Sequence, residues 1–306
     1  MLEQRAREQA LRLTGVLRTD HPGLLESNPI EDYLAGFDAM DPAVSYRAVP
    51  ERARRVTRAI EHGHGDPALN LYNQLALSHA ASSFGERCRA ERIPESVERN
   101  SREFLDGVIS ALASRTRGRY RMEVDRFAKE FAAARLKMVC CGPELVDLNG
   151  GVPKRSLLHP PRRRVLHRLA FILFRARGFS RFLESHLDRR LAREFNPKGY
   201  DAFYHRLAQL LATRPYLKGY VGAGAWYYDP AVSFISPELA YLIEVPIANG
   251  AEIFPLQRSE VVTQDALRLS PARGKAHQEG RYTPLAHMLV WPRKSLMAWS
   301  AEHWNG

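Results

Sequence analysis

The chain has 306 residues, of which 45% are apolar and 26% are charged, and its net charge is +11. This apolar fraction supports a packed core, which excludes an intrinsically disordered chain, and the length fits one large domain or two ordinary ones. No run of about 18 apolar residues is present and the amino terminus is charged, so we expect no membrane-spanning helix, no secretory signal and a cytoplasmic protein.

Residues 1–140 are predicted to form helices. In the helix expected over 94–115, Phe104, Val108 and Leu112 repeat at four-residue spacing and share one face. The segment CCGPELVDLNGGVP that follows contains glycines, prolines and an Asn-Gly turn signal. We therefore expect a helical domain over 1–150 and a second part over 151–306.

The second part is expected to begin with basic helices and to continue as a mixture of strands and helices. The basic helices are predicted at 161–177, 180–195 and 198–213. From residue 215 onward, short β-like runs alternate with helices near 237–247, 263–278 and 294–303. The predicted fold class is α+β, with a mainly helical N-terminal part and a mixed α/β C-terminal part.

The positive charge is concentrated in one block. Residues 1–150 hold 22 basic and 22 acidic side chains, residues 151–220 hold 16 and 4, and residues 221–306 hold 7 and 8. A local cationic field indicates an anionic partner. Within this block, residues 159–195 contain ten arginines around the apolar run LAFILF. The candidate anion-binding residues are Arg162, Arg163, Arg164 and Arg168.

Two interpretations of the basic segment stay open. It is either a core helix with a solvated basic face, or a surface that binds an anionic lipid interface or phosphate groups. Nucleic acid is the less favoured partner, because no RRM, KH, zinc-finger or helix-turn-helix signature is present.

His186-Leu187-Asp188 has the His-x-Asp spacing that occurs in the facial triad of non-haem iron enzymes. Leu183, Leu187 and Leu191 at four-residue spacing predict a helix, on which residues two positions apart diverge. We therefore expect His186 to be a packing residue, and the sequence predicts no metal site here.

A second candidate, His64, follows Glu61 at Glu-x-x-His spacing near a helix end, but a di-iron bundle needs this motif on two helices and no second copy is present. Cys88, Cys140 and Cys141 lack disulfide or zinc spacing, so reduced, mostly buried thiols are expected.

The stretch GYVGAGAWYYD over 219–229 combines three glycines with three aromatic residues. Glycines allow a backbone to approach a ligand closely, and amides ahead of a helix bind anions. The alternative is a glycine turn packed beneath the aromatic rings.

Helices and strands alternate after this stretch: helix 237–247, strand AEIF, helix 263–278 and strand PLAHMLVW. This order resembles the C-terminal half of the GNAT acyltransferases over roughly 85 residues. The resemblance implies that Gly222 and Gly224 cradle the pyrophosphate of acyl-CoA and that Ser270 and Arg273 complete the site. The sequence departs from the family at Gly219, where the family has Gln or Arg, and in the aromatic residues that precede the helix.

The leading interpretation is an enzyme that transfers an acyl group from a CoA or carrier-protein thioester to a small acceptor. Strand alternation predicts Trp226 and Tyr228 on one face, lining the acceptor pocket. His287 or Asp229 is the expected general base, and Tyr282 the acid on the leaving thiolate. No permanently bound cofactor is expected: acyl-CoA or a phosphopantetheine carrier enters as co-substrate, and an acidic carrier protein suits the basic block.

Two other functions remain open. One is a non-catalytic module that docks on an anionic lipid or RNA surface through 154–193. The other is a haem or non-haem iron oxygenase, which is supported only by scattered histidines.

Overall fold

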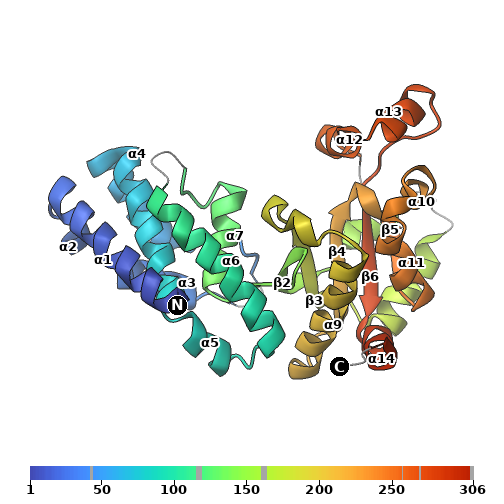
Figure 1. Cartoon of the computed structure of the whole chain (residues 1–306), viewed down its shortest axis with the longest axis horizontal. Helices are drawn as coiled ribbons and strands as arrows, with labels where there is room; N and C mark the ends of the chain where they lie inside the picture. The colour runs from blue at the N-terminus through green and yellow to red at the C-terminus, as the bar shows by residue number, and fades with distance from the viewer. Residues whose placement is uncertain (42–43, 115–118, 160–163, 257, 269, 304–306) are drawn as a thin grey trace. The chain divides into compact units, whose positions relative to one another are not determined.

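A computed structural model describes residues 1–41, 44–114, 119–159, 164–256, 258–268 and 270–303 (Figure 1). The chain forms two compact units, Met1–Cys140 and Cys141–Gly306. The first is helical and the second contains a mixed sheet, which confirms the predicted α+β fold class.

The first unit consists of helices and ends in one short strand. Its elements are α1 (Leu2–Asp20), α2 (Leu24–Ser27), α3 (Ile30–Asp38), α4 (Glu51–Ser82), α5 (Phe84–Ala90), α6 (Glu95–Ser114), α7 (Asp125–Ala134) and β1 (Met138–Cys140). Helix α4 is bent at Gly65, where φ is 77°, and its second segment continues through Pro67. The predicted face of α6 is confirmed, because Phe104, Val108 and Leu112 are all buried.

The second unit is built on a sheet whose strands mix two directions. Its strands are β2 (Glu144–Gly151), β3 (Ser180–Leu187), β4 (Gly219–Ala225), β5 (Glu252–Pro255) and β6 (His287–Pro292). These five lie in the order β2-β3-β4-β6-β5. Strands β3 and β4 are parallel, and the other pairs among the five are antiparallel. A parallel pair needs a long crossover, and helix α9 (Pro197–Thr213) supplies it.

The remaining helices of this unit are α8 (Val165–Ala170), α10 (Pro230–Ile235), α11 (Tyr241–Ala248), α12 (Glu260–Leu267), α13 (Pro271–Gln278) and α14 (Arg293–His303). A π-helical turn, Phe171–Arg175, continues α8. Shorter 3₁₀ turns lie at Lys154–Leu158, Arg189–Glu194, Trp226–Tyr228 and Pro237–Leu239.

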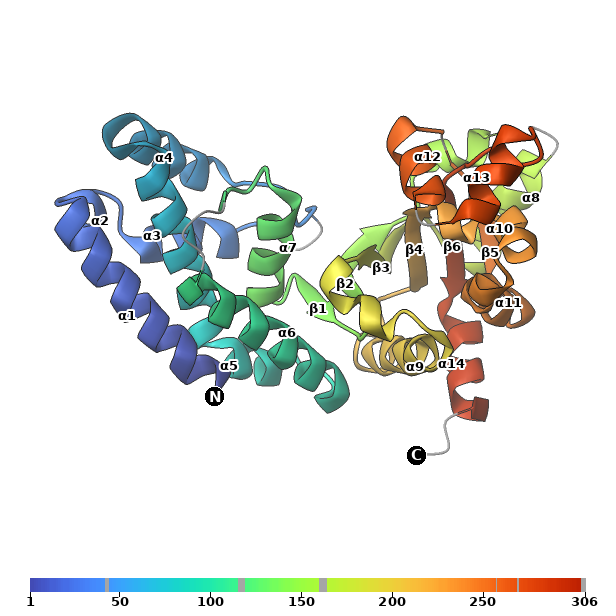
Figure 2. The ribbon, with the colours of Figure 1, turned by 45° about the horizontal axis from the view of Figure 1, so that its top comes forward.

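The sheet is covered on both faces. One face packs against the segment 152–176 through apolar side chains from four strands: Phe182, Val221, Phe254, Met288 and Val290. Helices α9 and α14 lie side by side on the other face (Figure 2). There the ring of Tyr204 is 5.1 Å from that of Trp291, and His205 stacks on Trp299 at 4.6 Å.

Two sequence predictions are wrong in this unit. Residues 180–187, predicted as a helix, form strand β3. Leu183 and Leu187 share a face at four-residue spacing in a helix and also in a strand, so the spacing does not distinguish the two. The predicted Asn-Gly turn lies within β2, where the pairing with β3 is irregular between Asp147 and Gly151. The predicted helix at 198–213 is confirmed as α9.

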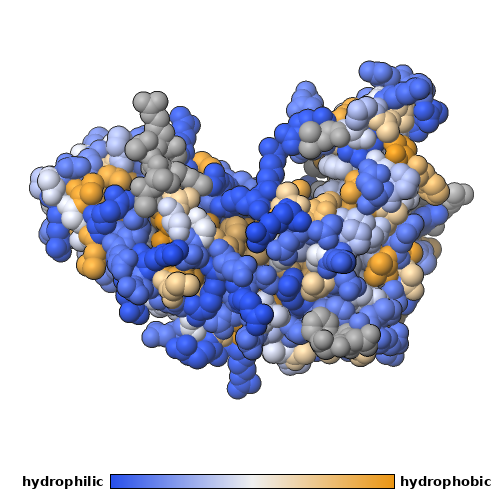
Figure 3. All heavy atoms as spheres, in the orientation of Figure 1, coloured by the Kyte–Doolittle hydropathy of each residue, from blue (hydrophilic) through white to orange (hydrophobic). Residues whose placement is uncertain are grey.

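The described part of the chain contains no helix that is long and apolar enough to cross a membrane. On the face shown in Figure 3, hydrophilic residues predominate on each unit and apolar residues form scattered patches.

We expect Gly219→Ala to destabilise the second unit by about 3 kcal/mol. Gly219 begins β4 with φ of 153°, and a Cβ there would clash with the carbonyl oxygen of Trp291 and lie 2.9 Å from the amide nitrogen of Arg293. All four tryptophans lie in the second unit, so thermal unfolding followed by tryptophan fluorescence monitors this unit specifically.

Gly274→Ala is the matched control. Gly274 lies inside α13, and a Cβ there meets no atom within 4 Å. Because alanine favours a helix more than glycine does, we expect this variant to gain about 0.5–1 kcal/mol. Equal unfolding temperatures for Gly219→Ala and the wild type would contradict the prediction.

Candidate functional site at one edge of the sheet

The carboxyl ends of the parallel strands β3 and β4 lie at the same edge of the sheet. Ligands of open sheets with parallel strands bind beyond the carboxyl ends of those strands. The register brings two titratable residues to this edge, because Glu144 pairs with Leu187 and His287 pairs with Ala225. Helix α9 follows β3, and the turn Trp226–Tyr228 follows β4. This edge is therefore the candidate site.

The predicted glycine-rich loop is part of strand β4. Gly222 is aligned with Ser185 of β3 and with Leu289 of β6, and the register shifts between Gly222 and Ala225. A side chain at Gly222 would collide with Tyr228, whose ring packs over this position. Gly224 is exposed, and a Cβ there would lie 2.5 Å from Leu256.

The aromatic residues Trp226, Tyr227 and Tyr228 do not continue the strand. They form a 3₁₀ turn in which Tyr227 and Tyr228 are buried and Trp226 is partly exposed. The prediction that Trp226 and Tyr228 share one face by strand alternation is therefore wrong. The physical reason is Asp229, which caps α10 by accepting a hydrogen bond from the amide of Ala231 at 3.0 Å.

Asp229 and His287 form a buried pair. Oδ2 of Asp229 is 4.0 Å from Nδ1 of His287. The same Nδ1 is 3.1 Å from the carbonyl oxygen of Leu285. A carbonyl only accepts hydrogen bonds, so Nδ1 carries the proton and Nε2 keeps its lone pair.

Burial sets the charge of this pair. Burial lowers the pKa of His287. The negative charge of Asp229 opposes this shift, and the positive charge of Arg168 adds to the shift. Burial also raises the pKa of Asp229, while its hydrogen bond to Ala231 and the charge of His287 lower it. The imidazole is consequently neutral near pH 7 and able to accept a proton at Nε2.

Three further predicted residues lie close to this pair. Burial raises the pKa of Tyr282, the charge of Asp229 adds to the rise, and that of Arg273 opposes it. The Arg273 guanidinium lies 4.3 Å from the centre of the Trp226 ring and donates to the hydroxyl of Ser236 at 2.7 Å.

Further hydrogen bonds hold Arg273 at the start of helix α13. Nε of Arg273 donates to the carbonyl of Ala266 at 2.6 Å, and Ser270 caps α13 by accepting from the amide of Arg273 at 3.2 Å. The structure thus brings together Asp229, His287, Tyr282, Trp226 and Arg273, with the guanidinium already engaged by protein groups.

A buried carboxylate surrounded by tyrosines lies at the same edge, and sequence reasoning missed it. Glu144 is fully buried, and its Oε1 accepts hydrogen bonds from the phenols of Tyr200 and, at 3.2 Å, of Tyr227. Burial first, and the Glu144 charge second, raise the pKa of Tyr200, Tyr204, Tyr220 and Tyr227. These phenols keep their protons and act as hydrogen-bond donors.

An apolar cavity of about 290 Å³ opens beside the first turn of α9. It is lined by Pro197, Lys198, Tyr200, Asp201, Tyr204, Tyr241 and Val245. The hydroxyls of Tyr204 and Tyr241 are buried and have no hydrogen-bond partner among the residues that the structure describes. Both tyrosines thus line the cavity, while their hydroxyl oxygens are themselves enclosed by protein.

The predicted basic residues differ in exposure. Arg162 and Arg163 lie outside the described residues. Arg164 is exposed beside α8, whereas Arg168 is buried and donates to the carbonyls of His159 and Leu157. The Arg168 guanidinium is therefore turned into the protein.

The predicted helix that would separate His186 from Asp188 is wrong, because His186 lies on strand β3. Its Nε2 is 3.8 Å from Oε1 of Glu184, while Asp188 binds Arg190 through both carboxylate oxygens. The ring of His64 lies edge-on to that of His21 at 5.7 Å. Within the described ranges, no group of three or more His, Cys, Asp or Glu side chains is arranged to hold a metal ion.

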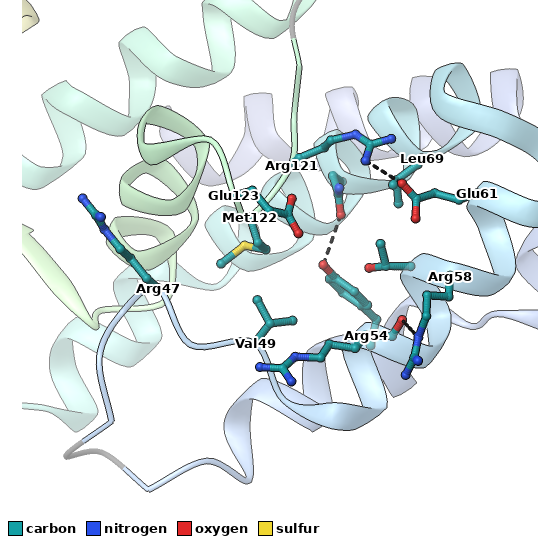
Figure 4. Close-up of a pocket in the computed structure, with 12 residues that line it drawn as sticks. Arg47, Val49, Arg54, Arg58, Glu61, Leu69, Arg121, Met122 and Glu123 are labelled. Carbon is teal, nitrogen blue, oxygen red and sulfur yellow. Dashed lines mark hydrogen bonds and ion pairs between the residues drawn. The ribbon is translucent and has the colours of Figure 1, made fainter.

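The first unit contains a separate cavity of about 390 Å³ (Figure 4). Four arginines contribute to its lining: Arg47, Arg54, Arg58 and Arg121. In the figure Arg121 extends toward Glu61, and it also binds Asp66 at 2.5 Å, on the far side of the bend in α4. Arg58 binds Glu51 at 2.6 Å. Internal ion pairs thus engage these arginines.

Comparison of the chain with protein-family models, with curated proteins and with solved structures finds no match.

The buried Asp229–His287 pair predicts how the stability of the second unit depends on pH. His287 has a folded-state pKa below its ordinary value of about 6.5, so on acidification the unfolded chain binds a proton that the folded chain does not. The stability of the second unit therefore falls as the pH is lowered from about 7.5 through 6.5. We expect His287→Gln to remove this contribution and to flatten the fall in tryptophan-monitored unfolding temperature.

The raised pKa of Asp229 acts with the opposite sign, because it makes the folded state bind more protons at lower pH. It therefore cannot produce the predicted fall. Identical pH dependence in the wild type and His287→Gln would contradict the assignment of a neutral buried imidazole.

Proposed function

We propose that the second unit is an acyltransferase that moves an acyl group from a phosphopantetheine-type thioester to a small nucleophilic acceptor. The observation that supports this proposal is the buried Asp229–His287 pair at the candidate edge of the sheet, with a neutral imidazole whose Nε2 can accept a proton. The resemblance of the C-terminal sequence to GNAT acyltransferases leads to the same reaction class.

In the proposed reaction the acceptor N–H or O–H loses its proton to Nε2 of His287 while its heteroatom attacks the thioester carbonyl. The new bond to carbon forms, the C–S bond breaks, and the imidazolium returns its proton to the leaving thiolate. Asp229, within 4.0 Å of the ring, stabilises the transient positive charge.

Tyr282 has a narrower role than the acid expected from the sequence. Its pKa is raised by burial, so at neutral pH it holds its proton more tightly than a thiol does. We assign it as a hydrogen-bond donor to the oxygen or sulfur that becomes negative. Trp226, partly exposed and stacked on Arg273, forms a wall of the acceptor pocket.

The donor is placed at the amino end of α9. Asn196 caps this 17-residue helix, and Lys198 lies in its first turn. Arg189 and Arg193 are exposed in the preceding 3₁₀ turn. Helix amino ends and nearby cations favour phosphate groups. In this proposal the adjacent apolar cavity of about 290 Å³ accommodates the donor arm.

We expect His287→Gln to lower kcat/KM for acyl transfer by about 10²–10⁴-fold, because a general base contributes a factor of this size. Release of the thiol from acetyl-CoA, in the presence of a panel of primary amines and alcohols, measures the rate. His303→Gln, at the exposed end of α14, is the control and should retain the wild-type rate. Equal rates in the two variants would rule out His287 as the base.

A separate prediction concerns the donor. Lys198→Glu places a negative charge in the first turn of α9, so it should weaken CoA binding at least tenfold, measured as the concentration of CoA needed to raise the unfolding temperature. Lys294→Glu is the matched control, because Lys294 is likewise the exposed second residue of a helix, α14. If CoA does not stabilise the wild-type protein, the donor assignment is wrong.

A further inference from the structure

The segment that covers the sheet face opposite α9 has an unusual charge composition. Residues 151–180 contain eight lysine and arginine side chains and no aspartate or glutamate. Of the described ones, five are exposed: Lys154, Arg155, Arg164, Arg175 and Arg177. The outward side of this segment is therefore cationic without acidic residues of its own.

The same segment exposes large apolar side chains. Leu158 is 71% exposed, Leu166 78%, Leu173 46% and Phe174 80%. They come from three elements: the 3₁₀ turn Lys154–Leu158, helix α8 and the π-helical turn Phe171–Arg175. A single exposed leucine is ordinary on a protein surface. Four large apolar side chains exposed among charges of one sign are unusual and indicate a binding surface.

The inward side of the segment anchors it. Leu157, Phe171 and Ile172 are buried in the core cluster that covers the sheet. The apolar side chains that point outward are therefore held on a fixed base. Their exposure belongs to the folded unit and does not require the segment to unfold.

We propose that these exposed residues form a docking surface for an anionic lipid bilayer. The docking surface consists of Leu158, Leu166, Leu173 and Phe174 with Lys154, Arg155, Arg164, Arg175 and Arg177. The apolar side chains enter the boundary between headgroups and acyl chains, and the cations lie among the anionic headgroups.

The chemistry of the surface favours lipid over RNA. Leucine side chains can enter an acyl-chain layer, but they neither stack on bases nor donate hydrogen bonds to them. RNA binding would require the arginines alone, with the leucines exposed to water. The segment is also too short to span a bilayer, so it would lie in the interface.

Co-sedimentation with vesicles tests this proposal with the full chain. We expect binding to vesicles of phosphatidylcholine with 30% phosphatidylserine, little binding to pure phosphatidylcholine, and weaker binding as salt is raised. Phe174→Ser should weaken binding about tenfold, which corresponds to about 1.4 kcal/mol of lost apolar insertion.

Phe234→Ser is the matched control. Phe234 lies in α10 of the same unit and is 85% exposed, against 80% for Phe174, so both changes spare the core. The control should bind vesicles as the wild type does. Arg155→Glu with Arg177→Glu should abolish the preference for phosphatidylserine.

Three results would overturn the proposal. They are equal binding of Phe174→Ser and Phe234→Ser, equal binding to neutral and anionic vesicles, and salt-sensitive binding to single-stranded RNA without vesicle binding. None of these measurements uses an acyl donor or an acceptor, so the proposal stands or falls independently of the acyltransferase activity.

Discussion

The arrangement of the second unit depends on one buried carboxylate. Glu144 is fully buried at the start of β2, where a charge is costly unless hydrogen-bond donors surround it. Its donors are the phenols of Tyr200 from α9 and Tyr227 from the turn after β4. The carboxylate therefore ties a strand, the crossover helix and the turn together at one edge of the sheet. Replacement of Glu144 would remove the acceptor of both phenols, and replacement of either tyrosine would leave the carboxylate with one donor fewer.

The turn fixed in this way positions the candidate acid–base pair. Tyr227 is held by Glu144, and the next residue, Tyr228, donates to or accepts from Tyr220 at 3.1 Å while packing over Gly222. Asp229 follows immediately and caps α10, and its carboxylate lies beside His287, the first residue of β6. A chain of buried hydroxyls thus determines where one carboxylate lies, and rigid support of this kind is what an acid–base pair requires.

The sequence predicts more of the fold than of the site. Helices of the first unit repeat their apolar residues at three- and four-residue intervals, which no strand reproduces over that length. Strand β3 was missed because Leu183 and Leu187 satisfy both periods. The candidate residues Asp229 and His287 stand out locally, one before a proline and one in an apolar run. Glu144 does not, because its phenol partners are 56 and 83 residues away and no spacing rule links them.

The docking surface and the acid–base pair share one structural element. Helix α8 exposes Leu166 outward, but its Arg168 points inward and donates to the carbonyls of Leu157 and His159. Burial lowers the pKa of His287, and the charge of Arg168 adds to that shift. The guanidinium does not lose its proton, so its positive charge is a constant part of the surroundings of the imidazole. The basic segment thus has two different sides. Exposed cations and apolar side chains lie outward, where we propose lipid docking, and one buried guanidinium lies inward.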